Sequence, residues 1–61
     1  MPIIKMELWA GRTKEQKAKL AEAFTKSAEE IMGTIPENTV IVFQDVSKDD
    51  WAKGGKLASD S

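Results

Sequence analysis

One long helical pattern decides the fold; it occupies residues 13–33 and reads TKEQKAKLAEAFTKSAEEIMG. Apolar residues recur there at three- and four-residue spacing, with lysines and glutamates opposite, which predicts a helix with one apolar stripe. Thr13 and Gln16 match a capping box at its start, and Gly33 favours its end. The stripe comprises Leu20, Ala21, Phe24, Ala28, Ile31 and Met32.

Two strand patterns flank this helix. Residues 3–9 alternate, with Ile4, Met6 and Leu8 on one side, which predicts a strand that starts at the first residues. Residues 39–45 contain the run Val-Ile-Val-Phe, which is apolar on both faces and predicts a strand covered on both sides. Strand, helix and strand together predict an α+β fold with one βαβ unit and parallel strands.

The last part of the chain contains two adjacent glycines, Gly54 and Gly55. Paired glycines mark a tight turn, which predicts a short C-terminal hairpin or an arm that reaches a neighbouring subunit. The alternative is a frayed terminal tail.

The length of 61 residues allows one domain, residues 1–61, with Met1 removed in the mature protein. So short a chain buries little apolar surface, and this one has no Cys for disulfides and no His for a zinc site. A two-stranded sheet with one helix also leaves one face and both edges open. Together these features predict a homo-oligomer.

Charge and hydropathy exclude several classes of protein. The net charge is −1, and positive and negative residues are interspersed among the 31% that are charged, so a nucleic-acid footprint is not expected. No apolar run has the length of a membrane span, and the first residues do not resemble a signal peptide. We therefore expect a cytoplasmic protein that binds neither nucleic acid nor membrane.

The candidate general base is Pro2. With no His, Cys or Tyr, Ser-His-Asp and Cys-His arrangements are impossible. The α-amino group remains, with an ordinary pKa of about 7.7–8.0. Removal of Met1 would expose the secondary amine of Pro2, and burial or a nearby cation would lower its pKa. On the Met-Pro dipeptide alone, a purely structural proline is the more frequent case.

Arg12 and Trp51 are the candidate binding residues. Arg12 is the one arginine among nine basic residues, and its planar guanidinium suits a carboxylate; the alternative is an incidental surface residue. Trp51 lies in a polar stretch, where it can anchor an oligomer contact, form the wall of an active site, or do both. Trp9 is expected to serve in packing.

Taken together, three stretches resemble the 4-oxalocrotonate tautomerase family over essentially the whole chain: MPI at residues 1–3, AGRTKEQK at 10–17 and SKDDWAKGGKLASD at 47–60. The resemblance implies that Pro2 is the general base, that Arg12 binds a substrate carboxylate and that Trp51 makes the pocket hydrophobic. It also implies no cofactor or metal, and a hexamer built as a trimer of dimers with sites shared between subunits.

One position departs from the family pattern. The best-known member has a second active-site arginine early in the second strand, where this chain has Val40. Its absence weakens the assignment of 2-hydroxymuconate as the physiological substrate and argues against a dehalogenase. The resemblance still implies enol–keto proton transfer on small 2-hydroxydienoate acids, within aromatic hydrocarbon catabolism. The alternatives are a decarboxylase or hydratase of small oxo acids, or a non-catalytic βαβ assembly module.

Overall fold

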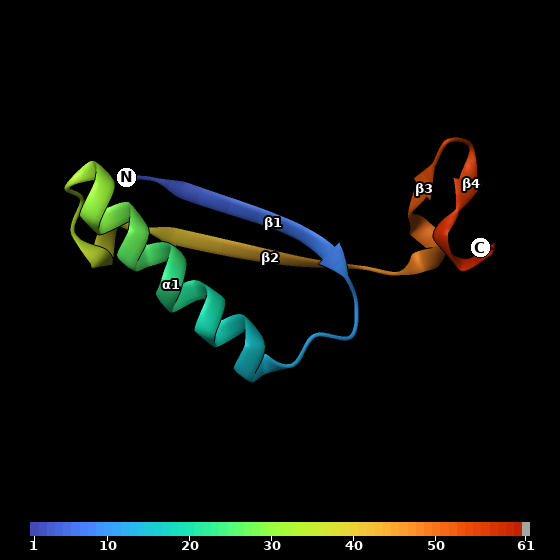
Figure 1. Cartoon of the computed structure of the whole chain (residues 1–61), viewed down its shortest axis with the longest axis horizontal. Helices are drawn as coiled ribbons and strands as arrows, with labels where there is room; N and C mark the ends of the chain where they lie inside the picture. The colour runs from blue at the N-terminus through green and yellow to red at the C-terminus, as the bar shows by residue number, and fades with distance from the viewer. Residues whose placement is uncertain (61) are drawn as a thin grey trace.

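A computed structural model describes residues 1–60 and shows a βαβ unit followed by an extended arm (Figure 1). The unit consists of β1 (Ile3–Trp9), α1 (Lys14–Met32) and β2 (Val40–Val46). The two strands are parallel, in a register that runs from Ile3 opposite Val40 to Trp9 opposite Val46. The predicted α+β fold with parallel strands is therefore confirmed. The remaining elements are the 3-10 helices Pro36–Asn38, Lys48–Asp50 and Ala58–Asp60, and the strands β3 (Ala52–Lys53) and β4 (Lys56–Leu57).

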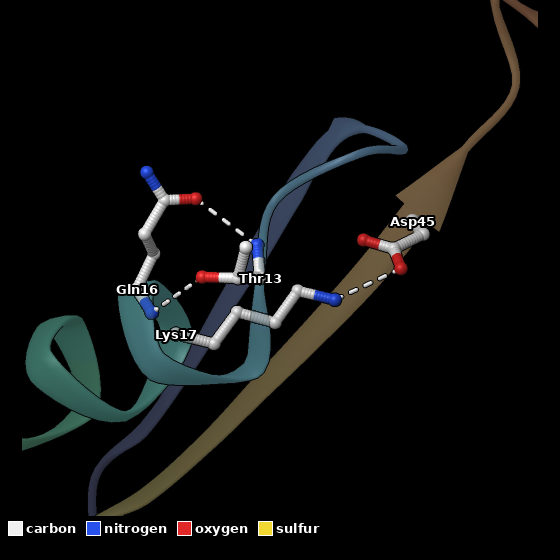
Figure 2. A network of polar contacts seen from close by, with 4 residues as sticks. All are labelled: Thr13, Gln16, Lys17 and Asp45. Atoms are coloured by element: carbon white, nitrogen blue, oxygen red, sulfur yellow. Dashed lines mark hydrogen bonds and ion pairs between the residues drawn. The ribbon is translucent and has the colours of Figure 1, made fainter.

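The ends of α1 follow the residues predicted to cap it. The Thr13 hydroxyl accepts the Gln16 N–H at 3.1 Å, and the Gln16 side-chain oxygen accepts the Thr13 N–H at 3.0 Å (Figure 2). Gly33 adopts the left-handed conformation, with a φ of 71°, and its N–H donates to the Glu29 carbonyl. A residue with a Cβ is disfavoured in this conformation, so the glycine ends the helix where the sequence predicted.

The helix covers one face of the sheet. Ile4, Met6 and Leu8 are half-buried, whereas their neighbours in β1 are exposed, as expected for a strand with one covered face. An ion pair from Lys17 Nζ to Asp45 Oδ2, 2.8 Å long, joins α1 to the end of β2 (Figure 2). Apolar contacts and this ion pair together fix the helix against the strands.

The other face of the sheet is open in a single copy of the chain. Val40, Val42 and Ile3 are exposed there, Ile3 to 64%. The expectation that β2 is covered on both faces is thus not met within one chain, because the one helix lies over the opposite face. The C-terminal end of the apolar stripe of α1 is also exposed to solvent: Ile31 is 83% exposed, and Met32 beside it is exposed as well.

The overall shape is long and thin rather than compact. The radius of gyration is 14.6 Å and the principal extents are 43 × 24 × 13 Å. A compact domain of this length has a radius of gyration of about 10 Å. Among residues 1–60, Ala28 alone is buried. One copy of the chain therefore encloses almost no hydrophobic core.

The C-terminal arm is an ordered hairpin that projects past the end of the sheet (Figure 1). β3 and β4 are antiparallel and are joined by Gly54 and Gly55, with φ of 62° and 83°. Two successive positive φ values are typical of the tight two-residue turns that glycine permits. The predicted hairpin is confirmed in place of a frayed tail. Of the described helices, none is long and apolar enough to cross a membrane.

Loss of the helix cap tests the local account of α1. Thr13→Ala removes the acceptor for the Gln16 N–H and should destabilise the protein by about 1 kcal/mol. We expect a lower thermal midpoint by circular dichroism at a fixed protein concentration. The control is Ser27→Ala, which removes an exposed hydroxyl within the helix and should leave the midpoint unchanged or slightly higher. A Thr13→Ala protein as stable as the wild type would contradict this role of the cap.

Candidate active site

Pro2 is held at the amino end of the parallel strand pair. It is half-buried, and its carbonyl accepts the Val40 N–H at 3.0 Å, which extends the β1–β2 ladder by one bond. A proline has no N–H to donate, so the first position of a strand suits it. This backbone hydrogen bond holds Pro2 at the N-terminal end of β1. Met1, which precedes it, is 81% exposed.

Val40 is therefore the nearest neighbour of Pro2 in the paired strand. It stands where the resemblance places a second arginine, and its side chain is exposed on the open face of the sheet. An isopropyl group offers no hydrogen bond and no charge to a carboxylate. Any anion that binds near Pro2 must find its cationic partner on another residue.

Arg12 lies at the opposite end of the sheet from Pro2. It is exposed in the turn between β1 and α1, whereas Pro2 precedes the first residue of β1 (Figure 1). The seven residues of β1 span about 20 Å at the usual rise of a strand. A single subunit thus does not bring these two predicted site residues together.

Trp51 also lies at the end of the sheet remote from Pro2, where it packs against Trp9. The ring centroids are 6.0 Å apart and the planes meet at 76°, an edge-to-face arrangement. Lys48 Nζ lies 4.6 Å from the centroid of the Trp9 ring, within range of a cation–π contact. Trp9, expected to serve in packing, is thus part of an aromatic pair that includes a predicted site residue.

A groove of about 500 Å³ opens beside this aromatic pair. The sequence analysis did not identify its two lysines, Lys53 and Lys56, as site residues, although the Lys-Gly-Gly-Lys pattern indicates that they face each other across a tight turn. Residues on either side of a two-residue turn stand opposite each other, so both lysines belong to one face of the hairpin. The lining residues are Trp9, Trp51, Lys53, Gly54, Lys56, Leu57 and Ala58.

A second groove, of about 550 Å³, runs between β1 and the C-terminal half of α1. Ile4, Met6, Phe24 and Ile31 are among its lining residues, so it is mainly apolar. It carries none of the predicted site residues. Within residues 1–60, no group of three or more acidic side chains lies close enough together to hold a metal ion.

The chain is similar to known tautomerases along nearly its whole length. The family model described as "Tautomerase enzyme" matches residues 2–61. A probable tautomerase of Bacillus cereus is 42% identical over 60 residues, which cover 98% of both chains. The 2-hydroxymuconate tautomerase of Bacillus subtilis is 37% identical over 60 residues, with 98% of this chain and 97% of the relative covered.

The fold agrees equally well with a solved structure. The crystal structure of a 4-oxalocrotonate tautomerase homologue superposes with a TM-score of 0.93 at 34% identity, covering 100% of this chain and 97% of the other. Sequence and fold thus match the same family along the full chain, and the resemblance noted from the sequence is confirmed. The chain belongs to the tautomerase family and is an enzyme of the tautomerase type.

Proposed function

We propose that the chain catalyses enol–keto proton transfer on small 2-hydroxydienoate acids, with Pro2 as the general base after removal of Met1. The observation that carries this proposal is the fixed position of Pro2, which the Val40 N–H holds at the end of the ladder. The composition supports it, because the chain has no His, Cys or Tyr to act as a base near neutral pH.

The proposed reaction is an isomerisation without redox change. The neutral Pro2 nitrogen accepts the proton of the substrate 2-hydroxyl, and the O–H electron pair forms the carbonyl. The conjugated double bonds shift, and a carbon along the conjugated chain takes a proton back from the Pro2 ammonium. Substrate and product therefore have the same composition, and the proline ends the cycle as a neutral amine.

Substrate binding is assigned to the other two predicted residues. Arg12 can hold a carboxylate through two parallel hydrogen bonds, which also supports the negative charge that develops on the conjugated system. Trp51 would cover the planar substrate and exclude water, and a drier site lowers the pKa of the Pro2 amine. A lower pKa leaves more of the amine neutral, and thus able to accept a proton, at physiological pH.

The proposed site requires several copies of the chain. Since β1 separates Pro2 from Arg12 and Trp51, a site that uses all three must draw on neighbouring copies. The apolar surface left open by one copy supports the same assembly, because a lone chain of this kind is marginal. We propose a homo-oligomer, a hexamer arranged as a trimer of dimers, in which further copies cover the open sheet face and the exposed end of α1.

Replacement of the proline tests the chemistry. Pro2→Ala should slow ketonisation of 2-hydroxymuconate, followed by ultraviolet absorbance, by about 10²–10⁴-fold, the usual contribution of a general base. Mass spectrometry should show that Met1 is absent from both proteins, and circular dichroism should show equal helix content. A variant with the wild-type rate would remove Pro2 from the mechanism. Release of carbon dioxide by the wild type would instead favour a decarboxylase.

A charge on the open sheet face tests the assembly. Val42 is 43% exposed there in a single chain, and Val42→Asp would bury a carboxylate between copies. Sedimentation velocity should show the wild type at a multiple of the 6.7 kDa subunit mass and the variant at a lower mass. Lys26→Asp, on the exposed side of α1, is the matched control and should retain the wild-type mass. A monomeric wild type, or a Val42→Asp protein of unchanged mass, would contradict the proposed assembly.

A further inference from the structure

The hairpin arm sets two like charges against each other. Lys53 in β3 and Lys56 in β4 are directly opposed in the antiparallel pair, so their side chains leave the hairpin on the same face. Like charges in directly opposed positions repel, which makes this an unfavourable pair for the folded hairpin alone. An anion bound between the two ammonium groups would turn the repulsion into attraction.

No acidic side chain of the described residues neutralises this pair. The ion pair recorded within residues 1–60 joins Lys17 to Asp45, and neither Lys53 nor Lys56 has a side-chain hydrogen bond in that range. The groove that both lysines line has no carboxylate among its lining residues. Asp49 and Asp50, the nearest acidic residues before the hairpin, lie on the preceding 3-10 helix outside that lining. The groove is therefore cationic.

The aromatic side of the groove selects the shape of the ligand. Trp9 and Trp51 meet edge to face and form a wall beside the lysines. Lys48 already covers the Trp9 ring, which adds a third cation close to the groove. A volume of about 500 Å³ lies within the usual range for small-molecule sites. Because the two rings are nearly perpendicular, a planar, conjugated carboxylate would stack on one of the indoles and place its charge at the lysines.

We propose that this groove binds a carboxylate of a planar, conjugated dicarboxylate substrate, with Lys53 and Lys56 as the specificity-determining cations. This inference rests on the proposed function, since Trp51 is the proposed wall of the same site. Val40 leaves the Pro2 end of the sheet without a guanidinium, and the lysine pair supplies positive charge at the Trp51 end instead. Arg12 holds one carboxylate of the substrate, and the lysines hold the other.

A pair of lysines binds the second carboxylate less selectively than an arginine would. An ammonium group is a compact point charge without the planar fork of a guanidinium, so it imposes less orientation on the carboxylate. Because Lys53 and Lys56 are exposed, their attraction for an anion is screened by salt. We therefore expect the preference for a second carboxylate to weaken as the ionic strength rises.

The intrinsic fluorescence of the protein reports on this groove directly. The chain has two Trp and no Tyr, and both Trp line the groove. The probes are trans,trans-muconate and sorbate, which share a planar diene and differ in that muconate has a second carboxylate. Neither has the enol hydroxyl, so binding is measured apart from turnover. At low salt the wild type should bind muconate about tenfold more tightly than sorbate, as expected for one additional charge-assisted contact.

The decisive variant is the double substitution Lys53→Gln/Lys56→Gln, which removes both charges and keeps a polar, unbranched side chain. It should bind muconate as weakly as sorbate, while Lys14→Gln/Lys19→Gln, on exposed positions of α1, should retain the wild-type preference. Equal affinities of the wild type for the two probes, or a preference that survives Lys53→Gln/Lys56→Gln, would overturn the inference.

The same titration separates this inference from the proposed proton transfer. Pro2→Ala should keep the wild-type preference for muconate over sorbate, because both probes present the same diene to the proline and differ in the carboxylate that the lysines bind. If the wild type prefers muconate through its lysines but does not ketonise 2-hydroxymuconate, carboxylate binding by the lysines is supported and the proposed proton transfer is wrong. If ketonisation depends on Pro2 but the wild type binds muconate and sorbate equally, the proposed proton transfer is supported and the proposed role of the lysines is wrong.

Discussion

The parallel pairing of β1 with β2 separates Pro2 from the other residues proposed for the site. At one end of the pair, the Pro2 carbonyl accepts the Val40 N–H at 3.0 Å; at the other, the Ala10 N–H donates to the Val46 carbonyl at 3.0 Å. Because backbone hydrogen bonds fix both ends, the strand cannot shorten to bring Pro2 to Arg12. A site that uses both residues must take them from different copies of the chain.

The same constraint links stability to the proposed activity. A chain with a radius of gyration of 14.6 Å and Ala28 as the one buried residue among positions 1–60 does not enclose a core. The copies that would cover its open apolar surfaces are also the copies that would complete its site. In the proposed assembly, Trp51 and the two lysines of one copy lie beside the proline of another.

Much of the fold could be predicted from residue periodicity and caps. Thr13, Gly33 and the alternation in residues 3–9 each act locally, so the sequence alone located α1 and β1. Periodicity shows that a stripe is apolar but not which molecule covers it, and for this reason the exposure of Ile31 was missed. Pro2, Arg12 and Trp51 were proposed from residue chemistry and resemblance. The lysine groove was not, because it depends on how the hairpin folds beside Trp9.

The most direct test of the shared site is complementation between two impaired variants. Pro2→Ala retains Arg12, Arg12→Ala retains Pro2, and the two are mixed in denaturant and refolded together. If each site draws these residues from different copies, random assembly leaves about a quarter of the sites with both intact. The mixture should then regain about a quarter of the wild-type ketonisation rate, while each variant refolded alone stays slow. A mixture no faster than the average of the two separate variants would contradict a site shared between subunits.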